Sequence, residues 1–313
     1  MAHTLAVMLL KTRRPLMVPL LVICLAAIGC SASSAAPELA ITPSTNAPVL
    51  GGASPKSEGA GDPTDGGNPQ VQSPSPTTPR PEWLGLRTIP TSSEGFGVAV
   101  ETPAELTKRR FTTLDTLPPP PANDVFNPTW VTLDQVPDVL ARSTWEPGCP
   151  VPPEKLAYIT VPFWGFDGWL HTGELIVHDD VAADVIGVFE QLYEARFPIE
   201  EMRIITRADV DAPPIGDGNN SGSFVCRPVT GGTSFSEHAK GLAIDINPFH
   251  NPYIRGDRVL PEQASAYTDR SLNEQGMLQL DSLVVKAFAD IGWTWGGTWN
   301  SLKDFQHFSA NGR

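Results

Sequence analysis

The sequence predicts an α+β fold, in which helices pack against an antiparallel sheet. Two β-rich segments, residues 155–161 and 169–177, flank a W-G-F-D-G turn and predict a hairpin. An apolar stripe at helical spacing follows in residues 181–196. A second helical segment then precedes two short β-rich segments, residues 293–295 and 305–309, which would close the sheet. The chain has no internal repeat.

The elements after the hairpin follow from local signals. Asp179 or Asp180 is expected to cap the first helix, and Pro198 to stop it. The apolar stripe consists of Val185, Val188, Phe189 and Leu192. Residues 202–206 predict a strand. Residues 209–223 are polar, with glycine, proline and two asparagines, and predict a long loop of the kind that often lines a site.

The last third of the chain contains the two histidines that carry the argument, His238 and His307. His238 and Asp245 lie seven residues apart and would point to opposite faces of an unbroken strand. Gly241 lies between them, so we expect a turn or short helix through His238 and then a strand over residues 242–246. A second helix is expected from a cap at Asp281 through Ala289, with Gly292 at its end. Asp304 is expected in a loop, and His307 on the strand at residues 305–309.

Two segments carry residues suited to metal chemistry: S-E-H-A-K-G-L-A-I-D at Ser236 to Asp245, and D-F-Q-H-F at Asp304 to Phe308. Two imidazoles and one carboxylate, from His238, Asp245 and His307, leave a fourth tetrahedral position for water, as in catalytic zinc sites. Asp304 is a further carboxylate that can accept the proton of that water.

These segments resemble the zinc peptidases that include the vancomycin-resistance D-alanyl-D-alanine carboxypeptidases and the phage L-alanyl-D-glutamate endolysins. The family pattern is S-x-H-x-x-G-x-A-x-D, followed by [D/E]-x-x-H with tryptophans just upstream. This chain supplies Ser236, His238, Gly241, Ala243, Asp245, Trp293, Trp295, Gly296, Asp304 and His307. The resemblance extends from about Trp145 to Ser309.

The resemblance implies a hedgehog-like peptidase fold with one zinc per chain on the sheet. His238, Asp245 and His307 would be the zinc ligands, and Asp304 the catalytic base. The arginine-bearing S-G-Y-R-type segment of many relatives is absent. Arg227, in F-V-C-R-P, lies in about the right place and either holds substrate or caps a turn. Ser236 likewise either bonds substrate or caps the turn.

Several other polar and aromatic residues are expected to have structural rather than catalytic roles. The histidines outside the motif, His171, His178 and His250, are expected to be structural, although His171 could line a groove. The tryptophans Trp293, Trp295 and Trp299 are expected in the core or cleft wall rather than as a sugar platform. Glu237 is expected at the surface, and Glu174 and Asp167 have no partner that the sequence names.

Residues 1–30 have the features of a secretory signal. A basic flank, Lys11 to Arg14, precedes an apolar run over residues 16–28 that is short for a membrane span. The run ends in A-I-G-C at Cys30, which resembles a bacterial lipobox and implies a lipidated Cys30. A plain signal cleaved nearby is the alternative, because Ala27 stands where leucine is preferred.

The remaining chain divides by composition. Residues 31–82 are rich in Ser, Pro, Gly and Ala, so we expect a disordered tether. Residues 83–140 are expected to form an extended arm that packs on the domain. Residues 141–313 would be the zinc peptidase domain, which is long enough to bury a core. We expect a monomer at the bacterial cell envelope, anchored by its lipid to the outer face of the cytoplasmic membrane.

The net charge limits the possible partners, and the cysteines limit the possible disulfides. The formal charge is −13, and loss of the signal removes three cations and no acid, giving −16. This argues against nucleic acid as a partner. Cys24 leaves with the signal and Cys30 is the lipid site, so Cys149 and Cys226 are expected to form a disulfide in an exported domain. Two free buried thiols are the alternative.

The function expected from these features is an exported zinc metallopeptidase that cleaves peptidoglycan stem peptides. The alternative is a catalytically silent zinc-containing module that binds the cell wall, and the spare carboxylate of Asp304 argues against it. Amidase action is disfavoured by the resemblance. The motifs are common to D-Ala-D-Ala carboxypeptidases and L-Ala-D-Glu endopeptidases, so the bond that is cut stays open.

Overall fold

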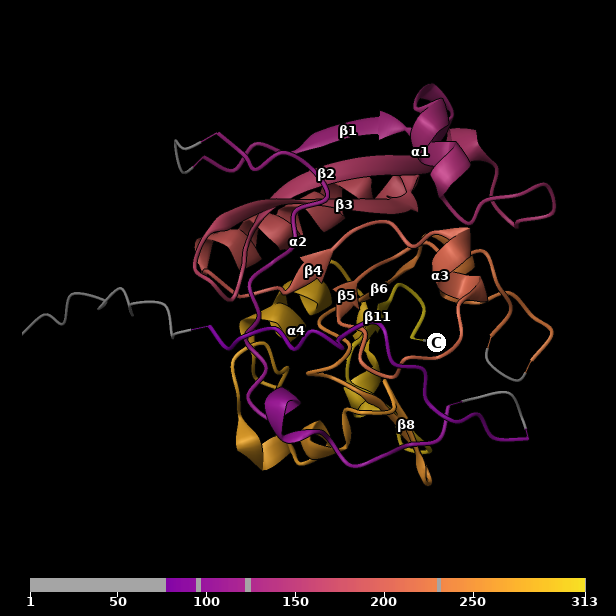
Figure 1. Cartoon of the computed structure of the whole chain (residues 1–313). Coiled ribbons are helices and arrows are strands. Elements are labelled where there is room, and N and C mark those ends of the chain that lie inside the picture. The colour runs from indigo at the N-terminus through magenta and orange to yellow at the C-terminus, as the bar shows by residue number, and fades with distance from the viewer. Residues whose placement is uncertain (1–76, 94–96, 122–124, 230–231, 313) are drawn as a thin grey trace, which may run out of the picture. The chain divides into compact units, whose positions relative to one another are not determined.

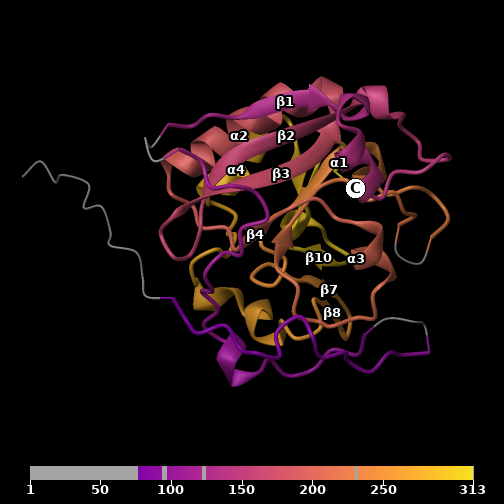
Figure 2. The same cartoon turned by 45° about the horizontal axis from the view of Figure 1, so that its top comes forward.

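The structure is a computed structural model that describes residues 77–312 except 94–96, 122–124 and 230–231. The predicted signal, the lipid site and most of the predicted tether lie outside these residues. The described chain is a mixture of antiparallel sheets and a few short helices (Figures 1 and 2), which confirms the α+β prediction. None of its helices has the length and apolar character needed to cross a membrane.

The predicted hairpin forms the largest sheet. Strands β2 (Leu156–Trp164) and β3 (Leu170–His178) pair antiparallel over their whole length, and β1 (Thr129–Thr132) adds to the free edge of β2. The W-G-F-D-G sequence makes the turn between β2 and β3, as expected. The sheet has one face on the core, where Ile159 and Leu175 are buried register partners.

Helix α2 (Ala182–Glu194) covers this sheet through the predicted stripe, whose four members are all buried. The prediction that Asp179 or Asp180 caps this helix is wrong. Asp179 and Asp180 lie in a 3-10 turn, and the ring of His178 accepts a hydrogen bond from the N–H of Asp180 at 3.2 Å. The helix therefore begins two residues after Asp180, because the 3-10 turn leads directly into it.

Helix α4 (Leu283–Asp290) packs against α2 and against strand β9 (Thr294–Trp295). Its N-cap is Ser282, whose hydroxyl accepts the N–H of Val285, and not the expected Asp281. One hydrophobic core joins the hairpin, α2, α4 and the short strands near the histidines, and it includes Phe288 stacked on Phe308.

Two small sheets position the candidate site. The first has the order β6-β11-β9, with β6 at Ala243–Asp245 and β11 at His307–Ser309. The second has the order β10-β7-β8, with β7 at Tyr253–Arg255, β8 at Arg258–Leu260 and β10 at Lys303–Asp304. Asp304 therefore lies in a strand and not in the expected loop, because β10 pairs with β7.

The region before the first histidine is more ordered than predicted. The strand expected at residues 202–206 is only β4 (Glu201–Met202), which pairs parallel with β5 (Asn220–Ser221). Helix α3 (Arg207–Asp211) extends into the loop expected at residues 209–223. A capping box between Thr206 and Asp209 starts this helix, and that pattern is visible in the sequence.

A disulfide joins Cys149 and Cys226, with 5.9 Å between their Cα atoms. This agrees with the predicted pairing. It lies beside a second apolar cluster that includes Leu133, Val139 and Phe224 and is next to helix α1 (Pro137–Arg142). The bond ties the start of the hairpin to the segment that leads into the histidine motif.

The described part of residues 77–121, called the N-terminal arm here, runs along the domain in mostly extended conformation (Figure 1). Arg109 inserts its side chain into the interior. It forms two hydrogen bonds to the buried carboxylate of Glu200, at 2.7 and 2.8 Å, and one to the carbonyl of Asp217. Residues 129–140, also part of the expected arm, supply β1 and most of α1.

Candidate metal centre

The local fold brings the two histidine segments together. A 3-10 helix, Glu237–Lys240, carries His238, and β6 then carries Asp245. Strand β11 pairs with β6 in a register that sets His307 opposite Asp245. The expected short helix through His238 is thus confirmed, and the predicted strands at residues 242–246 and 305–309 are present in shorter form.

Gly241 makes the change of direction between His238 and Asp245. Its φ of 69° lies in the left-handed region. A Cβ at this position would also collide with the backbone of Val177 and His178 in β3. The glycine therefore lets the motif dock against the hairpin and turns the chain into β6.

The three predicted ligands meet in one cluster. Nε2 of His238 lies 3.2 Å from Nδ1 of His307 and 3.4 Å from Oδ1 of Asp245, and the last two atoms are 3.0 Å apart. A tetrahedral zinc with bonds of about 2.0–2.1 Å has ligand atoms about 3.3 Å apart. The spacing of these three atoms therefore fits a zinc ion, and these residues are the group among those described that is suited to hold a metal.

Hydrogen bonds around the cluster orient its donors. Nδ1 of His238 donates to the carbonyl of Ser223 at 2.6 Å, which leaves Nε2 as an acceptor directed at the cluster. Burial alone would raise the pKa of Asp245, but the two imidazoles hold that pKa far below its usual value. Asp245 therefore stays an anion beside the histidines, as a metal ligand must.

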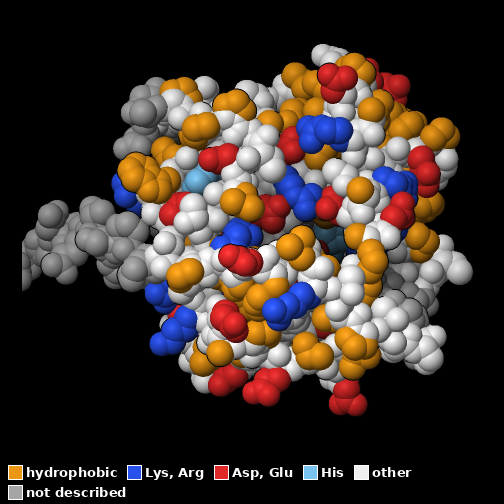
Figure 3. All heavy atoms as spheres, in the orientation of Figure 1, with side chains coloured by type: hydrophobic (Ala, Val, Ile, Leu, Met, Phe, Trp, Pro, Cys, Tyr) orange, Lys and Arg blue, Asp and Glu red, His pale blue; other side chains and the backbone are white. Residues whose placement is uncertain are grey.

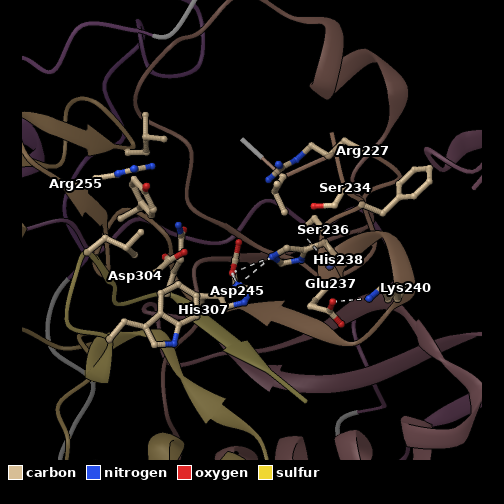
Figure 4. A pocket seen from close by; sticks show the side chains of 17 residues that line it. Arg227, Ser234, Ser236, Glu237, His238, Lys240, Asp245, Arg255, Asp304 and His307 are labelled. Atoms are coloured by element: carbon tan, nitrogen blue, oxygen red, sulfur yellow. Dashed lines mark hydrogen bonds and ion pairs between the residues drawn. The ribbon is translucent and has the colours of Figure 1, made fainter. Parts of the chain in front are cut away.

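Asp304 lies on the wall of the same cleft (Figure 4). Burial, and then the charge of Asp245, raises the pKa of Asp304 to about 6. Its Oδ1 is buried without a hydrogen-bond partner. A Cβ at residue 296 would lie 2.6 Å from the carbonyl oxygen of Asp304, so Gly296 permits the close approach of the two chains.

The cluster forms part of the lining of a cleft of about 450 Å³, within the usual size of ligand pockets. The space-filling view shows a hollow among charged side chains with histidine visible in its depth (Figure 3). Trp299 lines the cleft, with its ring 5.4 Å from that of His307. Trp293 and Trp295 are buried in the core, so the tryptophans serve as core and cleft wall, as expected.

Ser236 and Arg227 both line the cleft, but their side chains form different hydrogen bonds. The hydroxyl of Ser236 accepts the N–H of His238 and caps the 3-10 helix, which supports the turn-capping alternative. Arg227 follows the disulfide cysteine and donates to the carbonyl of Pro228 at 3.2 Å, while its guanidinium faces the cleft (Figure 4).

The prediction that Glu237 lies at the surface is wrong, because its side chain is buried. Its Oε1 accepts from Lys240 at 2.6 Å, and both side chains line the cleft. The sequence signal for this pairing was the spacing of three residues on a helical turn.

The remaining acids and histidines have structural partners. His171 bonds Asp115 of the N-terminal arm at 2.7 Å and Asp167 at 3.1 Å, and it does not line the cleft. Burial opposes its charge, but these two acids outweigh burial and raise the pKa of His171. Glu174 accepts from Tyr158 and Arg142. The other two histidines, His178 at the end of β3 and the fully buried His250, also have structural roles.

Sequence reasoning missed one wall of the cleft. Strands β7 and β8 form a hairpin that places Tyr253, Arg255 and Leu260 on that wall. The signal was present, since a Gly-Asp pair between short β-rich segments, Y-I-R-G-D-R-V-L, is typical of a tight hairpin turn.

The three donor residues form a candidate metal centre at a small antiparallel sheet. Residues 230–310 match the family model described as D-alanyl-D-alanine carboxypeptidase. The match confirms the resemblance over the stretch that carries the three predicted ligands and Asp304, and it supports a peptidase, hence a hydrolase. No curated protein and no solved structure matches the chain.

Proposed function

We propose that the protein is an exported zinc metallopeptidase that cleaves peptidoglycan stem peptides. The observation that carries this proposal is the triangle of donor atoms from His238, Asp245 and His307, with sides of 3.0 to 3.4 Å, beside a spare carboxylate. The family match supports a peptidase of this kind. Zinc, when bound, would lower the pKa of a water molecule and polarise the carbonyl of the substrate.

The chain's own residues account for proton transfer. Asp304 is partly buried and its pKa, raised to about 6, lies close to the working pH of a general base. It would accept a proton from the attacking water and return it to the nitrogen of the leaving amine. Arg227 would hold a substrate oxygen, since its guanidinium faces the cleft while the Ser236 hydroxyl is engaged as a cap.

The environment of Asp304 also weighs against a silent binding module. A buried carboxylate oxygen without a hydrogen bond destabilises the fold. A module without turnover would gain nothing from that cost, whereas a general base needs a free oxygen.

Export and a lipid anchor complete the proposal. They rest on the basic flank, the short apolar run and the A-I-G-C sequence at Cys30. Such an anchor would hold the domain next to the peptides it cleaves.

The test combines metal analysis with mass spectrometry of muropeptides. We expect one zinc per chain in the purified protein and hydrolysis of stem peptides by the zinc-loaded form. His238→Ala should lose both, whereas His178→Ala, outside the cleft, should keep both. Zinc content unchanged in His238→Ala, or no stem peptide cut by the zinc-loaded protein, would refute the proposal.

A further inference from the structure

Two hollows meet at the donor cluster. The larger, of about 450 Å³, contains Asp304, and a smaller one of about 290 Å³ lies on the side of α3. His238, Asp245 and Arg227 line both. A bound peptide can therefore continue on both sides of the bond that faces the cluster.

The position of Asp304 assigns the two ends of the cleaved bond. Asp304 lines the larger hollow and not the smaller one. Under the proposed function it returns a proton to the leaving amine, so the amine side of the bond lies in the larger hollow. The carbonyl side then lies in the smaller hollow.

The larger hollow has a cation available for a ligand. Arg255 lines it from the end of β7, and its guanidinium points across the cleft towards that of Arg227 (Figure 4). Within the described chain, the Arg255 side chain forms no hydrogen bond and no ion pair. A guanidinium left without a protein partner on a cleft wall suits a carboxylate, with which arginine forms two parallel hydrogen bonds.

Apart from Asp209 and the three residues that it shares with the larger hollow, the smaller hollow is lined by apolar side chains, those of Ile205, Val210 and Val225. Its acid, Asp209, is neutralised by Arg203 through hydrogen bonds of 2.8 and 3.0 Å. This side suits a small apolar residue.

We infer that the site cuts an internal peptide bond, with a carboxylate-bearing residue on the amine side held by Arg255 and a small uncharged residue on the carbonyl side. The inference rests on the proposed function. In a stem peptide, the bond between L-Ala and D-Glu has this character, because D-Glu continues the chain through its side chain and keeps a free α-carboxylate. Removal of one terminal residue would use only a small part of the larger hollow.

The test uses two synthetic peptides and the zinc-loaded full chain. The first is L-Ala–γ-D-Glu–L-Lys–D-Ala–D-Ala, and the second differs only in having the α-carboxylate of D-Glu amidated. We expect the first to be cut between L-Ala and D-Glu, and the second about tenfold to a hundredfold more slowly. Arg255→Gln should slow the first peptide by the same factor and leave the second unchanged.

Arg258→Gln is the matched control, because Arg258 is the register partner of Arg255 on the same hairpin and does not line the cleft. It should leave both rates unchanged. Release of terminal D-Ala alone would overturn the inference and leave the proposed function standing. Equal rates for the two peptides would overturn the role of Arg255. Absence of any cleavage would overturn the proposed function and the inference together.

Discussion

The surroundings of Asp304 suit the role of general base that we propose for it. Its backbone carbonyl and Cβ lie close to Gly296. Its carboxyl group feels the charge of Asp245, and one carboxyl oxygen is buried without a hydrogen-bond partner. Burial and the neighbouring anion both favour the protonated acid, which makes the carboxylate a stronger base than an exposed aspartate.

Asp304→Asn tests this role directly, because the amide has nearly the same shape but cannot accept the proton. We expect zinc content and fold to be retained, since Asp304 is not one of the three donors. Turnover of stem peptides should fall by about a hundredfold to ten-thousandfold. Steady-state rates, metal analysis and circular dichroism measure the three quantities.

Asp290→Asn, on the exposed end of α4, is the control for loss of one acid and should behave as wild type. Turnover by Asp304→Asn equal to that of wild type would remove Asp304 from the mechanism.

At the same scale, the sequence predicted the donor residues but not all of their neighbours. His238, Asp245 and His307 follow from residue types that fit a metal in an ordered pattern. Arg255 belongs to no such pattern, and only the pairing of β7 with β10 reveals that it reaches the cleft. Side chains that act through tertiary placement alone leave no local signal.

At the scale of elements, the N-terminal arm is fastened by a buried ion pair. The side chains of Arg109 and Glu200 are 2% and 1% exposed, and Phe111 and Phe249 flank the guanidinium. Burial alone would raise the pKa of Glu200, but the charge of Arg109 outweighs burial and lowers it. The arm therefore supplies the cation that neutralises this buried acid, to which Asn219 also donates a hydrogen bond.

We expect Arg109→Met to lower the free energy of unfolding by about 3–5 kcal/mol at pH 7, because it removes both charged hydrogen bonds to the buried carboxylate and leaves Arg80, at 3.6 Å, as a weaker partner. Glu200→Gln added to Arg109→Met should recover part of that loss. Urea unfolding followed by fluorescence measures all three proteins. A loss below about 1 kcal/mol for Arg109→Met would contradict the role given to the pair.

The contribution of this ion pair to stability depends on pH in a direction that can be worked out. The pKa of Glu200 is lower in the folded protein than in the unfolded chain, so its contribution is present above the unfolded value of about 4.3. It is lost as the pH falls through the folded value. The stability difference between wild type and Arg109→Met should therefore shrink under acid conditions.

Helices and strands were predicted correctly from the sequence where they are long enough to show a hydrophobic period. Strands β2 and β3 have 9 residues each and helix α2 has 13, which is enough to show a hydrophobic period. The elements α3 and β7 have only 5 and 3 residues, which is too few for a period to be recognised. Their signals were a capping box and a turn pair instead.

At the scale of the whole molecule, the proposed anchor determines where the domain acts. We expect Cys30→Ser to release the protein from the membrane fraction or to leave it uncleaved, because the acceptor of the lipid is gone. Cys24→Ser is the control, since it removes a cysteine from the apolar run and keeps Cys30. Fractionation with immunoblotting measures both. A mature N-terminus downstream of Cys30 in the wild type would contradict the anchor.

The register of β11 against β6 links metal affinity to folding. His307 faces Asp245 only in this pairing, and a slip of one residue would turn His307 to the other face and bring Gln306 or Phe308 into its place. An unfolded chain cannot assemble three donors that are 62 and 69 residues apart. Free zinc should therefore act as a thermodynamic ligand of the native state, and each tenfold rise above its dissociation constant should add about 1.4 kcal/mol to the free energy of unfolding.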